Sequence, residues 1–134
     1  MEKEFMIKLA DQLKNKTVLI VEDEISSEQL LSIILQDLTK EILLARTGKE
    51  AVEMCTINKN IDLILMDIKL PIMNGYEATR KIREFNKDVI IVAQTAYAYP
   101  HDREQALEAG CNDYISKPIN KKQLLEVIGN QFKE

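Results

Sequence analysis

With 134 residues, the chain is the size of one domain, and its hydrophobic share of 46% can fill a single core. Its net charge of −4 argues against direct binding of nucleic acid, and the lack of a long hydrophobic run argues against contact with a membrane core. Cys55 and Cys111 are too few for a disulfide framework and lack a metal-binding spacing, so we expect packing cysteines in a reduced, cytoplasmic protein.

Residues 1–14 are predicted to form an amphipathic helix, because Phe5, Leu9 and Leu13 recur every four residues on one face. We place a boundary after this segment, which divides the chain into an N-terminal extension or linker helix (1–14) and a main domain (15–134). The helix either belongs to a longer linker or packs against the domain, and the pattern leaves both alternatives open.

From residue 17 onward, short β-rich runs alternate with helical patterns, which is typical of βα units. The predicted strands are Thr17–Val21, Glu41–Ala45, Leu63–Met66, Val89–Ala93 and Asp113–Ser116. The predicted helices are Ser26–Leu38, Lys49–Asn58, Tyr76–Phe85, His101–Ala109 and Lys121–Phe132. Because crossovers between parallel strands are right-handed, helices on both faces of one sheet are the economical arrangement. We therefore predict an α/β fold, a flavodoxin-like doubly wound (βα)5 sheet of five parallel strands in the order 2-1-3-4-5.

Acidic residues follow two of these strands directly. Glu22 and Asp23 follow Val21, and Asp67 follows Met66. In the predicted topology the first and third strands are neighbours, and their carboxyl ends meet where ligands bind in open α/β sheets. Clustered carboxylates repel one another unless a cation or a proton intervenes. The sequence therefore predicts a divalent-cation site, and oxygen ligands of this kind suit magnesium.

Two further strands, the fourth and the fifth, end near a hydroxyl and a cation. The fourth strand runs into Thr95, and the fifth runs into Lys117. Beside a metal ion, both groups suit the oxygens of a phosphoryl group. Since carboxylates form acyl phosphates, Asp67 is the predicted nucleophile. Each feature alone has a simpler explanation, such as a strand end or a turn, but their occurrence at successive strand ends favours a phosphorylation site.

At these residues the chain resembles the receiver domain of two-component response regulators, including the receivers of hybrid histidine kinases. The matching segments are VLIVEDE at 18–24, LMDIKLPIMNG at 65–75, Thr95-Ala96 and Lys117-Pro118, and the resemblance covers about residues 16–132. It implies a magnesium-dependent acceptor that takes a phosphoryl group from a phosphohistidine on a histidine kinase or histidine phosphotransfer protein. Such a domain signals by a conformational switch and is no enzyme, although it assists its own phosphorylation and dephosphorylation.

The resemblance also implies a role for the acids and the loop that follows them. Asp67 matches the phosphoacceptor and Asp23 a direct magnesium ligand. Glu22 matches the acidic neighbour of that ligand, where many receivers have Asp. The backbone carbonyl of Lys69 matches a further metal ligand. Together with Tyr97, Lys69 also stands at a position that tunes hydrolysis of the acyl phosphate, and two long side chains there predict slow to moderate autodephosphorylation.

The other matching residues are assigned to phosphate binding and to the switch. Lys117 matches the lysine that pairs with the phosphoryl group, and its bond to Pro118 is expected to be cis. Thr95 matches the switch hydroxyl, and Tyr114 matches the aromatic residue that moves with it.

Leu30 and Ile33 lie outside the core-facing stripe of the helix predicted over 26–38. In the family this helix binds phosphotransfer partners, so the two side chains either form a docking patch or are covered by neighbouring loops.

Particular residues argue against three other functions. A phosphatase of the haloacid dehalogenase type needs a second Asp two residues after the nucleophile, where this chain has Lys69. A flavodoxin needs hydroxyls and glycine in its first loop, where this chain has acids. A phosphorylation-independent interaction module is disfavoured by the intact set of site residues. As no effector domain follows Phe132, we expect action by protein contact, either as a stand-alone regulator or as the receiver of a hybrid kinase.

Overall fold

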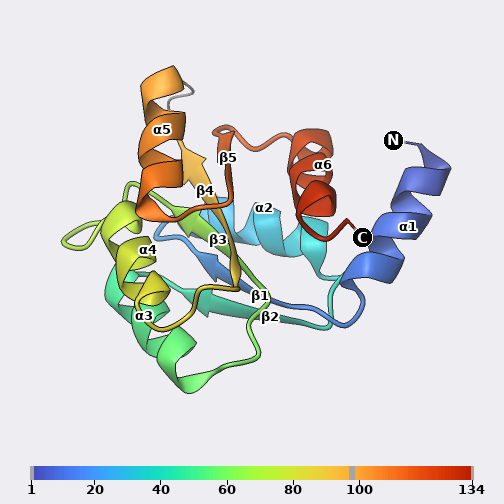
Figure 1. The fold of residues 1–134 in the computed structure, drawn as a ribbon. Coiled ribbons are helices and arrows are strands. Elements are labelled where there is room, and N and C mark those ends of the chain that lie inside the picture. Colours follow the sequence, from blue (N-terminus) through green and yellow to red (C-terminus); the bar gives the residue numbers. More distant parts are fainter. Residues whose placement is uncertain (1, 97–98, 134) are drawn as a thin grey trace.

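The computed structural model describes residues 2–96 and 99–133 (Figure 1). Helices and strands alternate after an initial helix. In chain order the elements are α1 (Lys3–Leu13), β1 (Thr17–Val21), α2 (Ile25–Leu35), β2 (Glu41–Ala45), α3 (Gly48–Ile57), β3 (Leu63–Asp67), α4 (Gly75–Arg83), β4 (Ile90–Thr95), α5 (Pro100–Ala109), β5 (Asp113–Ser116) and α6 (Lys121–Gln131).

The five strands form one parallel sheet in the order β2-β1-β3-β4-β5, which confirms the predicted fold. Helices cover both faces, α3, α4 and α5 on one and α1, α2 and α6 on the other (Figure 1). Every residue of β1 and β3 is buried, as expected for central strands enclosed on both sides. Side chains alternate between the two cores, so Ile64 and Met66 face α3–α5 while Leu63 and Leu65 face the other layer.

Several predicted boundaries differ from the structure by one to three residues, and two of these differences have a clear local cause. The first helix of the sheet domain, α2, ends at Leu35 instead of Leu38, because the chain tightens there: the Leu38 N–H donates to the Leu35 carbonyl at 3.0 Å in an i→i+3 turn, and the Thr39 hydroxyl donates to the same carbonyl. β4 continues to Thr95 instead of ending at Ala93, since Thr95 still pairs with Ser116 on β5. The second correction matters for the site, because it places the last residues of β4 inside the sheet.

The N-terminal helix α1 packs beside α6 (Figure 1). Leu9 and Leu13 are 1% and 0% exposed and join the core beneath α2 and α6. A Cβ atom at Gly129 of α6 would lie 3.4 Å from the Leu9 side chain, so the two helices approach closely. The N-terminal helix therefore forms part of the packed core of the domain.

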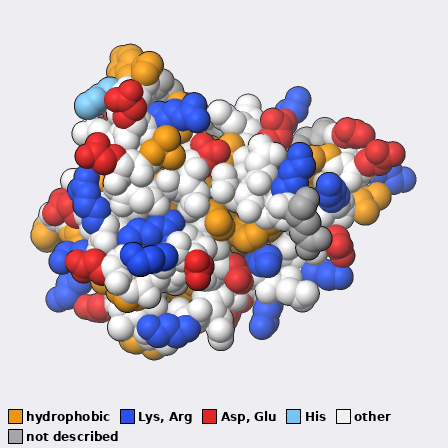
Figure 2. Space-filling view, in the orientation of Figure 1, with side chains coloured by type: hydrophobic (Ala, Val, Ile, Leu, Met, Phe, Trp, Pro, Cys, Tyr) orange, Lys and Arg blue, Asp and Glu red, His pale blue; other side chains and the backbone are white. Residues whose placement is uncertain are grey.

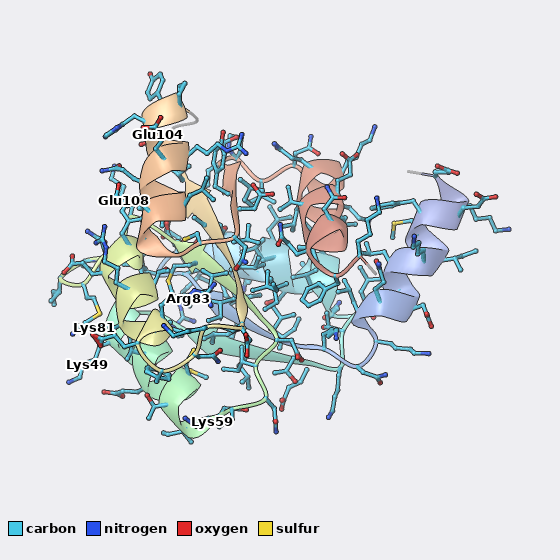
Figure 3. The ribbon with its side chains drawn as sticks, in the orientation of Figure 1. Lys49, Lys59, Lys81, Arg83, Glu104 and Glu108 are labelled. Atoms are coloured by element: carbon cyan, nitrogen blue, oxygen red, sulfur yellow. The ribbon has the colours of Figure 1, made fainter. Side chains whose placement is uncertain are left out.

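The face formed by α3, α4 and α5 carries interspersed basic and acidic side chains (Figure 2). Arg83, labelled in Figure 3, ties the end of α4 to the end of α5. Its guanidinium group donates to the carbonyls of Gly110 and Val89 at 2.9 and 2.7 Å and to the Asn112 side chain at 2.8 Å. These bonds hold the layer of helices against the edge of β4 and β5.

Within the described part of the chain, no helix has both the length and the apolar character that crossing a membrane requires.

Candidate functional site

Three carboxylates converge at the carboxyl ends of β1 and β3. The register pairs Val21 with Met66, so Glu22 and Asp67, one residue further on, emerge from neighbouring strands. One carboxylate oxygen from each of Glu22, Asp23 and Asp67 lies within 4.8 Å of the others. Glu22 is 0% exposed and Asp67 is 3% exposed, whereas Asp23 is open to solvent. The structure therefore brings together the three acids that the sequence placed at strand ends.

Lys117 is the cation of this cluster. Its Nζ atom lies 3.0 Å from Glu22 Oε2 and 3.4 Å from Asp67 Oδ1. The residue directly follows β5, and its backbone N–H donates to the Thr95 carbonyl at 2.7 Å, which fixes the start of its side chain next to β4. The Lys117–Pro118 peptide bond is cis, as expected. An ammonium group thus reaches two carboxylates on two other strands.

Burial and charge set the protonation of this pair. Burial raises the pKa of Glu22 to about 7, the Asp67 charge acts in the same direction, and the hydrogen bond from Lys117 opposes both. Burial alone would lower the pKa of Lys117, but its hydrogen bond with Glu22 and the charge of Asp67 outweigh that effect and raise it. A buried acid with a raised pKa signals a shortage of positive charge, which an added cation would supply.

The loop after β3 is built to hold Asp67 in place. The Lys69 backbone N–H donates to Asp67 Oδ1 at 3.1 Å. Asn74 and Glu77 form a capping box at the start of α4, with bonds of 3.0 and 3.3 Å. A Cβ atom at Gly75 would overlap the Asp67 carbonyl oxygen, so only glycine permits this close return of the chain.

The same loop contains a strained residue that sequence reasoning missed. Ile72 has φ 67° and is fully exposed. A β-branched residue rarely adopts the left-handed region, where its Cβ crowds the following carbonyl. No local signal announces this conformation, because the sequence offers no glycine or asparagine at that position.

The two predicted switch residues lie on two adjacent strands, Thr95 on β4 and Tyr114 on β5. Thr95 is the last residue of β4, is 8% exposed and shares the edge of the site with Lys117. Tyr114 on β5 pairs with Ala93, is half-buried and packs against the core beneath α3–α5. Tyr97, predicted to influence hydrolysis, lies outside the described residues.

Leu30 and Ile33 are exposed on α2, at 42% and 63%. Leu30 lines a groove of about 470 Å³ that reaches the candidate site, and the other lining residues are Glu24, Ser26, Ser27, Lys117, Pro118 and Ile119. Ile33 is not among the lining residues. The structure thus brings one of the two predicted docking residues next to the lysine of the site.

Gln94 is a second residue that sequence reasoning missed. It is 0% exposed and lies on β4 in register with Asp67. A signal was available in the sequence, because an amide interrupts the apolar run of residues 90–93 directly before Thr95.

Comparison with known proteins places this geometry in a family. Residues 18–129 match the family described as response regulator receiver domain. The chain is 40% identical over 129 residues to hybrid signal transduction histidine kinase I of Dictyostelium discoideum. That match covers 90% of this chain but 7% of the kinase, so the chain spans a small part of that relative.

Two solved structures are similar in fold and sequence. One is the Saccharomyces cerevisiae complex of the histidine phosphotransfer protein Ypd1 with the Ssk1 receiver domain, at a TM-score of 0.83, 36% identity and coverage of 89% of this chain and 90% of that chain. The other is the receiver domain of the sensor kinase PA1611 from Pseudomonas aeruginosa, with magnesium in its active-site cleft. It matches at a TM-score of 0.78 and 35% identity, covering 88% of this chain and 98% of that chain.

Proposed function

This chain belongs to the family of response regulator receiver domains, and we propose that Asp67 is the residue on which it accepts a phosphoryl group. The observation that carries this proposal is the pairing of a buried strand-end carboxylate with Lys117 at 3.4 Å and with the Lys69 N–H at 3.1 Å. A carboxylate held this way is oriented by its surroundings and has a cation beside it, which suits attack on phosphorus.

The transfer is a substitution at phosphorus. A carboxylate oxygen of Asp67 forms the new P–O bond as the P–N bond of a phosphohistidine breaks, and the leaving imidazole keeps the bonding electrons. Asp67 Oδ1 is engaged by the Lys69 N–H and by Lys117, so we assign the attack to Oδ2. Lys117 neutralises charge on the phosphoryl oxygens during this step.

The donor set fits a hard divalent cation, and we propose Mg²⁺. The fit rests on three carboxylates with oxygens within 4.8 Å of one another, and the pKa of Glu22, raised mainly by burial, supports it because an added cation would favour the charged form of this acid. Glu22, Asp23, Asp67 and the backbone carbonyl of Lys69 would hold the ion. Bound there, it supplies positive charge to the phosphoryl oxygens. The PA1611 receiver, which holds magnesium in its cleft, supports the choice of metal.

We propose that Thr95 and Tyr114 transmit the modification. Phosphorylation adds a charge of roughly −1.5 to −2 at the site. Thr95 ends β4, its carbonyl accepts a hydrogen bond from the Lys117 N–H, and its hydroxyl is the group that turns toward the new charge in this proposal. Tyr114 lies on the paired strand and packs under α5, so its repacking alters the surface of α5, β5 and α6. This is a local charge event that biases a two-state element.

The phosphoryl donor is proposed to be a phosphohistidine on a histidine kinase or histidine phosphotransfer protein. The related Ssk1 receiver, crystallised with Ypd1, supports this kind of partner. On this chain, Leu30 and Ile33 offer exposed apolar contacts on α2, and the groove that Leu30 lines leads to Lys117. A partner seated on α2 would bring its histidine to the open edge of the sheet.

The proposal is tested by incubating the protein with acetyl phosphate and Mg²⁺ and measuring its intact mass. We expect one phosphoryl group on the unmodified chain and none on an Asp67→Ala variant. Asp37→Ala, which removes an exposed acid just after α2, is the matched control and should be phosphorylated normally. An adduct that persists in Asp67→Ala would assign the modification to another residue. A wild-type chain that takes no phosphoryl group would favour a phosphorylation-independent interaction module.

A further inference from the structure

Within the described part of the chain, the side-chain amide of Gln94 is fully buried and has no hydrogen-bond partner. Its side chain is 0% exposed, and among the described residues neither Nε2 nor Oε1 has a hydrogen-bond partner. Buried polar groups are almost always hydrogen-bonded, because leaving one unpaired forfeits its interaction with water. An apolar residue would fill this strand position without that cost, so the amide requires an explanation.

The register of the sheet places Gln94 in the row of the candidate site. β3 and β4 pair Asp67 with Gln94, and β4 and β5 pair Gln94 with Ile115. Paired residues of parallel strands point to the same face, here the face of the core beneath α2 and α6. Glu22, Asp67 and Gln94 therefore stand side by side on three adjacent strands.

The side chain of Lys117 reaches across β4, the strand that carries Gln94. Lys117 follows β5, whereas the carboxylates that it contacts follow β1 and end β3. β4 lies between β5 and β3 in the sheet, and Gln94 is the β4 residue in the row of Asp67. Lys117 thus spans β4 to reach Glu22 and Asp67, and Gln94 is the neighbour of Asp67 on that strand.

We infer that Gln94 is a positioning residue that acts through Lys117: its Oε1 atom accepts a hydrogen bond from the Lys117 ammonium group during phosphoryl transfer. This inference rests on the proposed function of Asp67 and extends it. Lysine carries three donors and no acceptor, and in the resting protein the carboxylates of Glu22 and Asp67 occupy the ammonium group. When those carboxylates instead neutralise a bound cation or the phosphoryl group, a neutral acceptor next to Asp67 in the sheet can hold the ammonium group at the site.

A neutral amide suits this task better than a third acid would. It orients the ammonium group without cancelling the positive charge that the phosphoryl oxygens need. It is also already out of water in the resting protein, so forming the bond requires no further desolvation. The unpaired amide is a cost in the resting state that is relieved when the bond to Lys117 forms, and such strain is typical of functional sites.

The experiment compares stability with phosphorylation rate in three variants of Gln94. Gln94→Leu and Gln94→Met remove the amide, whereas Gln94→Asn keeps an amide on a shorter stem. Each is incubated with acetyl phosphate and Mg²⁺, and the rate of Asp67 phosphorylation is followed by intact mass. The thermal midpoint is recorded on the same preparations. Val92→Ala, on the same strand and face but deeper in the core, controls for altered packing.

We expect opposite rankings in the two measurements. Leu and Met should raise the thermal midpoint and slow phosphorylation by about tenfold, because one hydrogen bond to a charged group is lost. Asn should be the least stable of the three and yet phosphorylate faster than Leu. Val92→Ala should lower the midpoint at an unchanged rate. In a Lys117→Met background, Gln94→Met should cause no further loss, because both act through one contact.

Wild-type phosphorylation rates in Gln94→Leu and Gln94→Met would overturn the inference. Gln94 would then be a polar residue that the core tolerates, or one whose amide is hydrogen-bonded to a buried water. Losses that multiply in the Lys117→Met background would also overturn it, because Gln94 would then act independently of the lysine. Both results presuppose an Asp67-dependent adduct on the wild-type chain, so they are distinct from a failure of the proposed function itself.

Discussion

Lys117 lies closer to Glu22 than to Asp67: its ammonium nitrogen is 3.0 Å from a Glu22 carboxylate oxygen, and the corresponding distance to Asp67 is 3.4 Å. In the resting protein the lysine therefore serves mainly as counter-ion of a fully buried acid. Removing one partner of such a pair leaves the other as a buried charge without a counter-ion, which destabilises the fold. The charges of this site are therefore interdependent.

The first prediction concerns the pH dependence of stability. The pKa of Glu22 is raised from 4.5 to about 7 in the folded chain, so its contribution to stability is fully present below pH 4.5 and is lost as the pH rises through 7. In metal-free buffer, the unfolding free energy of the wild type should fall relative to Glu22→Gln between pH 5 and pH 8. The difference is on the order of 3 kcal/mol.

Urea unfolding of both proteins at several pH values measures this difference. Glu41→Gln, at an exposed position of β2, serves as the control and should follow the wild type. Parallel profiles for wild type and Glu22→Gln would show that Glu22 titrates as an ordinary acid.

The second prediction concerns magnesium. Mg²⁺ should raise the thermal midpoint, because a ligand that binds only the folded state stabilises it by about 2.7 kcal/mol at a hundredfold excess over Kd. The rise should shrink below pH 6, where Glu22 is mostly protonated, and should disappear in Asp23→Ala. Glu24→Ala, one residue beyond the cluster and equally exposed, should keep it. An equal loss in both variants would mean that general surface charge attracts the ion.

The third prediction tests the docking role of α2. Replacing Leu30 and Ile33 together with Glu should slow phosphoryl transfer from a phosphohistidine partner by about tenfold or more, the cost of losing a central apolar contact. Transfer from acetyl phosphate should not change, because this small donor needs no docking surface. Ile57→Glu, at an 84% exposed position on α3, is the control for added surface charge. A matching decrease with both donors would assign the two residues to the folding of the site instead.

The fourth prediction concerns the strained loop. Ile72 has φ 67°, so Ile72→Asn should raise the unfolding free energy by about 1 kcal/mol, because asparagine tolerates the left-handed region. Ile72→Val keeps the branched Cβ and should bring no gain. Chemical denaturation of the three proteins provides the comparison, and a gain of equal size in both variants would contradict backbone strain as the cause.

The fifth prediction concerns the N-terminal helix. We propose that residues 1–14 are an extension that completes the core of the receiver domain at 15–134. Leu13→Ala should then lower the unfolding free energy by about 2–5 kcal/mol, the usual range for a buried leucine. Ile7→Ala, on the 61% exposed side of the same helix, should change it by less than about 0.5 kcal/mol. Similar small effects of both substitutions would leave α1 as a dispensable linker.

Much of the fold could be predicted because its signals are local. The apolar runs 17–21 and 63–66 are long enough and uniform enough to identify buried strands, and glycine or polar residues separate them from the helices. Strand order then follows from the small set of connections that parallel sheets permit. Boundaries were harder, since the end of β4 is decided by pairing of Thr95 with a strand that comes 21 residues later, at Ser116.

By itself, the sequence determined the sheet, its order and the identity of the residues at its carboxyl edge, because periodicity and strand-end chemistry are properties of neighbouring residues. Only the tertiary structure decided which groups face one another. It paired Lys117 more closely with Glu22 than with Asp67, buried the Gln94 amide beside Asp67 in the sheet, and packed α1 on the core. Those outcomes depend on burial and on distances between strands far apart in the chain, and burial is what gives charges and unpaired amides their energetic weight.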